Sequence, residues 1–259
     1  MKQSHADALE AAVFAGSILL ESGAEIFRVE DTVLRIAKAY GVQSCNTFTL
    51  SSGFFTTAGG VNEEYFAKVR YIPLSAARLD KVEAVNQLSR EIVEGQHTVE
   101  EAYRKLQAIA DMPKYPRVLR LAAAAVGCAS FCCMFGGSLL DCLASSFAGF
   151  LLYTFITAIE TRKLSKITVN IAGGAIATLA SMLLVLLGLG NNLSQVIIGA
   201  IIPLVPGVPF TNAIRDMAGG DYIAGSVRLL DALLIAFCIA GGVGVVYALR
   251  FSLLGGIVL

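Results

Sequence analysis

Long uncharged runs fill the second half of the chain, and all but one are about as long as the roughly 20 apolar residues that a helix needs to cross a bilayer. Gly190-Asn191-Asn192 divides the longest run, residues 167–214, which exceeds the length of one span. We therefore predict an α-helical membrane bundle over residues 113–259. Its five expected transmembrane helices lie near residues 118–136, 140–159, 167–189, 193–210 and 229–249.

The pattern before residue 113 is different, because short helical and strand-like segments alternate there. Apolar positions recur at helical spacing up to Gly41, with a break at Ser22-Gly23, and Thr98 with Glu101 forms a capping box. Segments rich in Thr, Phe and Val indicate strands. Residues 1–112 are thus expected to be a small α+β domain that ends before Pro113. The expected elements are helices at 7–40, 75–94 and from residue 99, and strands at 42–52, 53–58 and 67–73.

Charge supports the same division. Only 15% of the 259 residues are charged, and residues 1–120 hold most of the 20 basic and 20 acidic side chains. No basic patch interleaved with aromatic residues indicates nucleic-acid binding. The six cysteines and two histidines show neither a disulfide framework nor zinc spacing, so no metal or other cofactor is expected.

Basic residues predict the orientation of the bundle, because loops that carry Lys and Arg stay in the cytoplasm. They cluster before the first expected span, between the second and third, and between the fourth and fifth. The N-terminal domain is therefore expected in the cytoplasm and the C-terminus outside, although Arg250 alone disagrees. The basic residues concerned are Lys114, Arg117, Arg120, Arg162, Lys163, Lys166, Arg215 and Arg228.

The first candidate site is a polar cluster after the apolar part of the first helix. On a helix, Glu25 and Arg28 are three residues apart and can form an ion pair. Composition alone favours a solvated helix face, and the functional alternative is a polar site or docking surface beneath the membrane. No nucleophile–base pair indicates a catalytic site here. The candidate residues are Glu21, Gly23, Glu25, Arg28, Glu30 and Asp31.

The second candidate site follows the fourth expected span, where three prolines and a glycine interrupt the helix. Transporters use broken helices of this kind to bind substrates with freed backbone groups and helix ends. Arg215 could receive a substrate carboxylate, and Asp216 or Asp231 an amino group or a proton. A simple helix end next to a cytoplasmic loop is the alternative. The candidate residues are Pro203, Pro206, Gly207, Pro209, Asn212, Arg215, Asp216, Asp221 and Asp231.

These two clusters carry a family resemblance. The segments ESGAEIFRVEDTVLRI (21–36) and PLVPGVPFTNAIRDMAGGDYIAGSVRLLDALLIA (203–236) resemble the threonine/serine exporter family of bacterial membrane proteins. The order of a cytoplasmic α+β domain and five spans is also similar. Some family members are single chains of about ten spans, whereas others are split into a larger subunit, which this chain resembles, and a separate small membrane subunit of four or five spans.

The resemblance implies a subunit of a proton-coupled secondary transporter in the bacterial inner membrane, with no enzymatic activity of its own. Its substrate would be a small amino acid, threonine or serine, or a dicarboxylate such as succinate. Its partners would be the small membrane subunit and the lipid bilayer, with a homo-oligomer as a further alternative. Two other functions are open: a hydrolase-like enzyme tethered to the membrane, and a regulatory subunit that gates a membrane complex.

Overall fold

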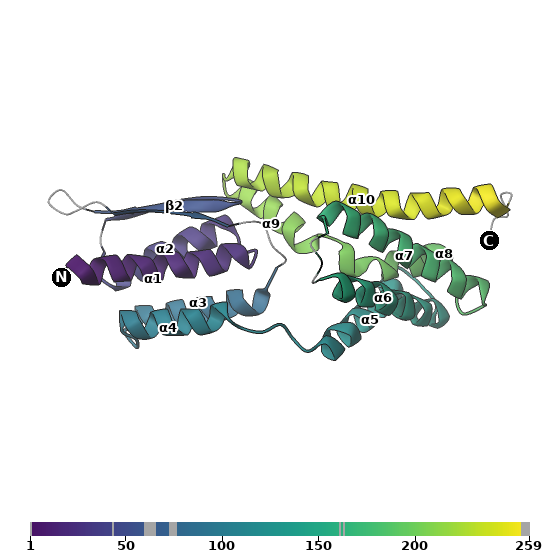
Figure 1. The fold of residues 1–259 in the computed structure, drawn as a ribbon, viewed down its shortest axis with the longest axis horizontal. Helices are drawn as coiled ribbons and strands as arrows, with labels where there is room; N and C mark the ends of the chain where they lie inside the picture. The colour runs from purple at the N-terminus through teal and green to yellow at the C-terminus, as the bar shows by residue number, and fades with distance from the viewer. Residues whose placement is uncertain are drawn as a thin grey trace. The chain divides into compact units, whose positions relative to one another are not determined.

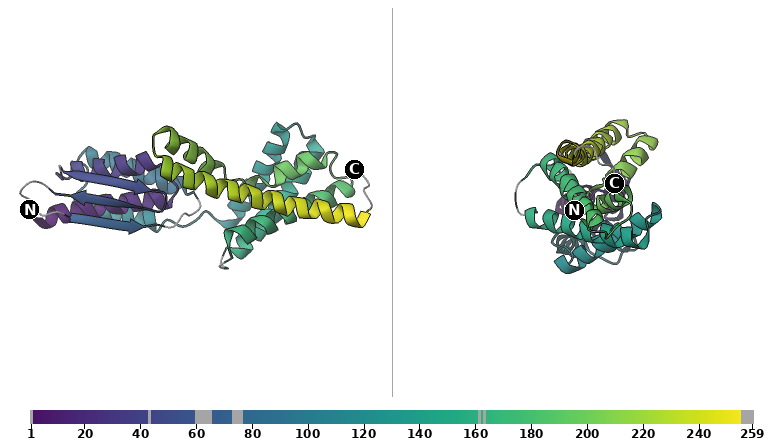
Figure 2. Two further views of the ribbon diagram at one scale, coloured as in Figure 1. Left: turned by 90° about the horizontal axis from the view of Figure 1, so that it is seen from above. Right: turned by 90° about the vertical axis from the view of Figure 1, so that its right-hand side faces the viewer.

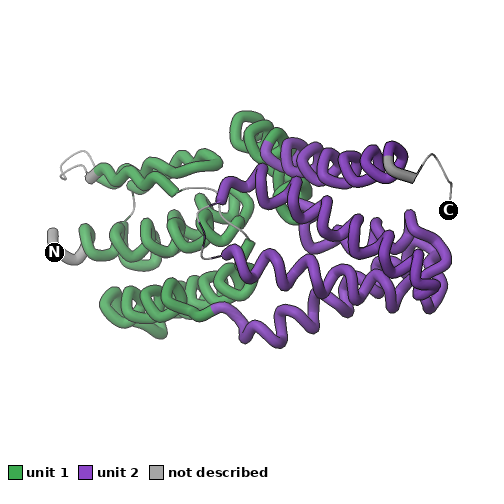
Figure 3. Tube along the Cα trace, turned by 45° about the vertical axis from the view of Figure 1, so that its right-hand side comes forward, with its two compact units in different colours: residues 1–113, 207–230 green, residues 114–206, 231–259 purple. Residues whose placement is uncertain are grey.

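The computed structural model describes residues 2–42, 44–59, 66–72, 77–160, 162 and 164–254. It is mostly helical with one small sheet (Figure 1). The chain forms two compact units, residues 1–113 with 207–230 and residues 114–206 with 231–259 (Figure 3). Residues 207–230, which the sequence analysis assigned to the transmembrane part, thus pack in the same unit as the N-terminal residues.

Four helices of the first unit surround its core. The predicted break at Ser22-Gly23 is confirmed, since α1 ends there and α2 starts at Ile26. The capping box at Thr98 is also confirmed, because its hydroxyl accepts from the backbone N–H of Glu101 and the Glu101 carboxylate accepts from that of Thr98. Residues 43, 73, 75 and 76 of the predicted elements lie outside the described residues. The four helices are α1 (Lys2–Glu21), α2 (Ile26–Ala39), α3 (Leu79–Val93) and α4 (Val99–Ala110).

The predicted strands form an antiparallel sheet in the order β1-β2-β3. The left view of Figure 2 shows them side by side. Side chains alternate across the sheet, so Phe54 is buried whereas its neighbour Phe55 is 47% exposed. Phe55 pairs with Phe48 on one side and Val69 on the other. The strands are β1 (Cys45–Leu50), β2 (Gly53–Ala58) and β3 (Phe66–Tyr71).

One hydrophobic core joins the helices to the inner face of the sheet. Helix α2 contributes a stripe at helical spacing that includes Ile26, Val29 and Val33. Phe54 from β2 packs into the same core. Ala224, from the first turn of helix α10 (Tyr222–Leu254), is also part of it. The core therefore includes a residue more than 110 positions beyond the N-terminal segment, which fixes the start of α10 on this unit.

The structure supports a helical membrane protein with four or five spans. Within the part of the chain that the structure describes, four helices are long and apolar enough to cross a bilayer, and a fifth span results if the pair on either side of Val205-Pro206 counts as one broken span. The predicted fourth span, 193–210, is therefore interrupted: it consists of α8 (Leu193–Ala200), a 3-10 turn (Ile202–Leu204) and the start of α9 (Gly207–Ala218). The helix that contains the last predicted span, 229–249, starts at Tyr222. The four uninterrupted helices are α5 (Arg117–Met134), α6 (Leu139–Ile159), α7 (Lys166–Leu186) and α10.

Small residues allow the helices of the second unit to approach closely. A Cβ on Gly242 of α10 would lie 2.1 Å from the carbonyl oxygen of Ile171 on α7, and one on Gly174 would lie 2.6 Å from that of Ile239. Glycine is therefore required where these two helices touch.

The buried carboxylate of Asp141 joins two loops at one end of this unit. It accepts hydrogen bonds from the Ser138 hydroxyl (2.7 Å) and from the backbone N–H groups of Asn191 (2.6 Å) and Asn192 (2.8 Å). Its polar groups are thus satisfied without a cation.

Candidate functional site

Helix α9 carries most of the second candidate cluster. The backbone breaks at Val205-Pro206, and the helix restarts at Gly207 with Pro209 in its first turn, where proline costs no intrahelical hydrogen bond. Asn212, Arg215 and Asp216 follow at spacings of three and four residues, which places them on one side of the helix. They all contact the turn between α1 and α2, in the same compact unit.

Asp216 lies at the centre of these contacts. Its side chain is fully buried, and one carboxylate oxygen accepts from the backbone N–H of Ile26, at the start of α2, at 3.0 Å. The other accepts from the Arg228 guanidinium at 2.8 Å. Glu25, at the N-cap position of α2, makes no side-chain cap. A residue 190 positions away thus caps this helix, where a negative charge is favoured.

Arg228 reaches Asp216 because α10 packs closely on α9. A Cβ on Gly225 would lie 2.4 Å from the Met217 side chain and 2.8 Å from the Ala213 carbonyl oxygen, so only glycine fits between the helices. The Arg228 side chain is 5% exposed and also donates to the Ala24 carbonyl at 2.9 Å. Both ends of the guanidinium are therefore occupied.

A second ion-pair group lies beside the first. Glu25 is 7% exposed and pairs with Arg28, three residues later, at 3.0 Å, as the sequence analysis predicted. It also accepts from Arg215 of α9, whose side chain is 55% exposed. The Asn212 amide donates to the Gly23 carbonyl at 2.8 Å. The two candidate clusters, distant in sequence, therefore form one polar network.

An open cavity of about 330 Å³ borders this network. Its size is in the range of small-molecule sites. Residues of the α1–α2 turn, α3 and α9 line it, so it lies within the first compact unit. Its lining combines apolar side chains with charged and amide groups, a mixture suited to a small polar metabolite. The polar and predicted residues that line it are Gly23, Glu25, Arg28 and Asn212 from the two candidate clusters, and Glu83, Asn86 and Arg90 from α3.

Glu30 and Asp221 are at the edge of the same arrangement. The Glu30 carboxylate accepts from the backbone N–H of Thr49 at 2.8 Å and thereby ties α2 to β1. Burial raises the pKa of Glu30 above its ordinary value, and the negative charge of Asp221 adds to this shift. Asp221 itself lies between α9 and α10. Glu30 therefore has a structural role, because its hydrogen bond holds β1 against α2.

The network does not include Asp31, Asp231, Pro203 or Pro206. Asp31 is exposed and pairs with Arg35. Glu21 is the last residue of α1 and is exposed. Asp231 pairs with Lys166 at 3.6 Å in the second unit. Pro203 and Pro206 also belong to that unit, where they shape the break before α9.

Sequence reasoning did not select Arg228 or the α3 residues. Arg228 had a usable signal, since a charge directly before the last expected span, 229–249, needs a partner. Glu83, Asn86 and Arg90 had none, because exposed polar residues on an amphipathic helix are ordinary. Only the tertiary structure brings them to the cavity.

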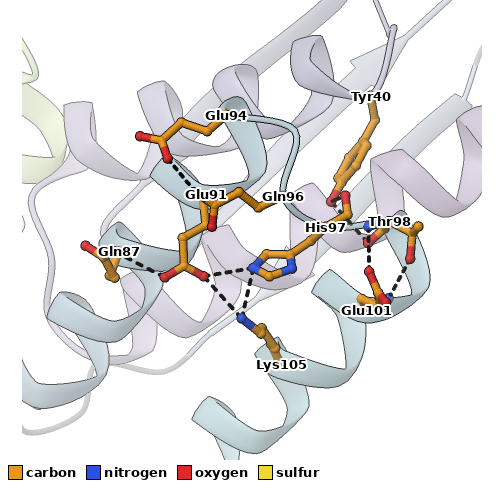
Figure 4. A network of polar contacts seen from close by, with 9 residues as sticks. All are labelled: Tyr40, Gln87, Glu91, Glu94, Gln96, His97, Thr98, Glu101 and Lys105. Carbon is orange, nitrogen blue, oxygen red and sulfur yellow. Dashed lines mark hydrogen bonds and ion pairs between the residues drawn. The ribbon is translucent and has the colours of Figure 1, made fainter.

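A further polar network connects α3 with the start of α4 (Figure 4). The Glu91 carboxylate contacts the Nε2 of His97 at 2.8 Å and accepts from Gln87 (3.1 Å) and Lys105 (3.2 Å). Hydrogen bonds from His97, Gln87 and Lys105 lower the pKa of Glu91 to about 2. Across the described residues, no group of three or more His, Cys, Asp or Glu could hold a metal ion.

Comparison with known proteins identifies relatives of this chain. The chain is 26% identical to the "Probable succinate transporter subunit YjjP" of Escherichia coli over 90% of both chains. It is also 26% identical to the "Threonine/serine exporter" of Corynebacterium glutamicum, with 88% of this chain aligned to 48% of that protein. A "Probable threonine/serine exporter" of Mycobacterium tuberculosis is 23% identical, over 93% of this chain and 46% of its own. No solved structure matches.

These relatives are transporters, which decides against the tethered enzyme. In the two exporters, this chain matches about half of the length, whereas it matches nearly all of the transporter subunit. The sequence profile described as "Putative threonine/serine exporter" matches residues 10–250, which include both clusters of the polar network. The chain therefore belongs to the threonine/serine exporter family.

Proposed function

We propose that this chain is the larger subunit of a two-component secondary exporter in the bacterial inner membrane. It would move small carboxylate-bearing metabolites, either threonine and serine or a dicarboxylate such as succinate, out of the cell. The observation that carries the proposal is the cavity of about 330 Å³ beside the Glu25, Arg28 and Arg215 group, in a chain with four or five candidate spans.

The match to the relatives supports a separate partner. The transporter subunit aligns along nearly its whole length, and the exporters have about as many residues again. We assign the function of that additional half to a small membrane subunit. The basic residues of the loops support an N-terminus in the cytoplasm and a C-terminus outside. The cavity would then face the side from which an exporter takes its substrate.

The charged side chains beside the cavity could exchange their ion-pair partners for a substrate. Arg215 is more than half exposed, so a substrate carboxylate could replace Glu25 as its partner on the way into the cavity, while Glu25 keeps its pair with Arg28. Asp216 is the acidic group best placed to couple this exchange to a proton, because its carboxylate joins α9, α10 and the start of α2. Its protonation would weaken the pair with Arg228.

Efflux from preloaded cells tests the proposal. Cells that express the chain with its membrane partner are loaded with labelled threonine, serine or succinate, and efflux is compared for wild type, Arg215→Ala and Arg35→Ala. Arg35 is a matched control, since it forms an exposed ion pair with Asp31 outside the cavity. We expect Arg215→Ala to lower efflux and Arg35→Ala to leave it unchanged. Efflux from cells with the partner alone, or efflux of every substrate unchanged by Arg215→Ala, would contradict the proposal.

A further inference from the structure

Helix α3 forms one wall of the cavity, and it is not part of either sequence motif. Its contribution includes Leu79 and Val82, which are apolar, and three polar side chains. Glu83, Asn86 and Arg90 are spaced three and four residues apart, so they follow one face of the helix. The Cα atoms of Glu83 and Arg90 are separated by about 10.5 Å along the axis, at 1.5 Å per residue.

These three side chains have unused bonding capacity, in contrast to the opposite wall. Among the described residues, neither Glu83 nor Asn86 makes a side-chain hydrogen bond or ion pair, and Arg90 donates only to the neutral Gln87 amide at 3.0 Å. Glu25 and Arg28 instead pair with each other, and Glu25 also with Arg215. The charges that remain without an opposite charge are one carboxylate and one guanidinium.

We propose that Glu83 and Arg90 determine substrate specificity by binding the ammonium and carboxylate groups of a small zwitterionic α-amino acid. Arg90 holds the carboxylate with paired N–H donors, Glu83 accepts from the ammonium, and Asn86 lies between them on the helix. This inference rests on the proposed function and decides between its two substrate classes.

The charges explain why a dicarboxylate is disfavoured. Its first carboxylate can bind Arg90, but the second then lies near Glu83, where like charges repel. Lys81, the other cation of α3, does not line the cavity and donates to the Ala110 carbonyl. At about 4 Å in a well-hydrated site, one such unit-charge interaction changes affinity roughly fivefold. Specificity of this kind depends on the repulsive group as much as on the attractive one. Glu83 is therefore the residue that separates amino acids from dicarboxylates.

Removing one group at a time from both ligand and protein tests the assignment. The full chain in detergent is titrated calorimetrically with L-threonine, N-acetyl-L-threonine, L-threonine methyl ester and succinate. We expect threonine to bind the wild type at least about fivefold more tightly than the other three. Glu83→Gln should remove the penalty for N-acetylation and strengthen succinate binding. Arg90→Gln should remove the penalty for esterification, and Arg90→Lys should partly restore it.

Two control variants test whether the loss of a charge outside the cavity is enough to change the ligand preference. Glu94→Gln removes a carboxylate at the end of the same helix, and Arg35→Gln removes an exposed guanidinium, both outside the cavity. Neither should change the order of the ligands, and thermal unfolding should show that every variant is folded.

The outcomes separate this inference from the proposed function. The inference is overturned if succinate binds wild type as tightly as threonine, if no ligand binds, or if Glu83→Gln leaves the ratio of the two affinities unchanged. Efflux that still depends on Arg215 would then leave the exporter function standing. If cells with the chain and its partner export none of the three labelled compounds, threonine, serine and succinate, the proposed function fails, whatever the calorimetry shows.

Discussion

Replacement of Asp216 by Asn is the most direct test of the buried network. Asparagine has nearly the shape of aspartate, and its side-chain oxygen can still accept from the Ile26 N–H at the start of α2. What the substitution removes is the negative charge 2.8 Å from Arg228. The Arg228 guanidinium, 5% exposed, would keep only the Ala24 carbonyl as a partner.

The expected cost follows from this burial. Removal of one partner from a buried ion pair costs about 3–5 kcal/mol, because the other charge stays buried without compensation. The retained cap and the Ala24 contact place Asp216→Asn at the lower end, about 3 kcal/mol. Asp216→Ala would also lose the cap, which adds about 1 kcal/mol. For a compact unit of this size, about 3 kcal/mol corresponds to a fall of roughly 6–12 °C in the melting temperature.

Thermal unfolding of the purified chain in detergent measures the effect. Asp231→Asn is the matched control: its pair with Lys166 is 3.6 Å long, and both side chains are partly exposed. An exposed pair contributes at most about 1 kcal/mol, so this control should lose no more than roughly 4 °C. If Asp216→Asn and Asp231→Asn melt at the same temperature, the Asp216–Arg228 pair does not hold the unit together and the reasoning is wrong.

Two further predictions concern other parts of the chain. Gly242→Ala should lower stability by about 1–3 kcal/mol, because the added methyl group meets the backbone of α7. Gly244→Ala is its control and should be neutral or slightly stabilising, since its Cβ would meet nothing within 4 Å. Melting curves of the two variants would show the difference. For Glu91, the lowered pKa means that wild type should be more stable than Glu91→Gln above pH 4.5 and should lose this advantage as the pH falls toward 2. A constant difference between those two melting curves from pH 7 to pH 3 would exclude this linkage.

Local pattern was sufficient to predict most elements of this protein. The break at Ser22-Gly23, the capping box at Thr98 and the three strands all depend on residues close in sequence, and the structure confirms them. The break that the prolines predicted in the fourth span, 193–210, is also confirmed, because the helix is interrupted at Val205-Pro206 before α9. Proline showed that the helix must break but not that a new helix would start at Gly207.

The candidate site was only partly predictable because its contacts cross the sequence. Glu25 with Arg28 could be foreseen from their spacing on a helix. The cap of α2 could not, since the side chain that accepts from the first N–H groups of a helix is usually that of the N-cap residue itself, and here Asp216 takes that place from 190 positions away. Likewise, nothing local distinguishes Glu83 and Arg90 from other polar residues on the surface of α3.

The network also raises the question of why buried charges are present at all. A buried ion pair seldom adds net stability over apolar residues of similar size, so the Asp216–Arg228 pair is better explained by register or function than by stability. The double variant Asp216→Leu, Arg228→Met separates these effects, because it removes both charges together. We expect its melting temperature to recover most of the loss seen in Asp216→Asn, while efflux stays low because no titratable carboxylate remains to join α9 to α2. Full efflux from a stable double variant would show that the pair serves only to set the packing of the helices.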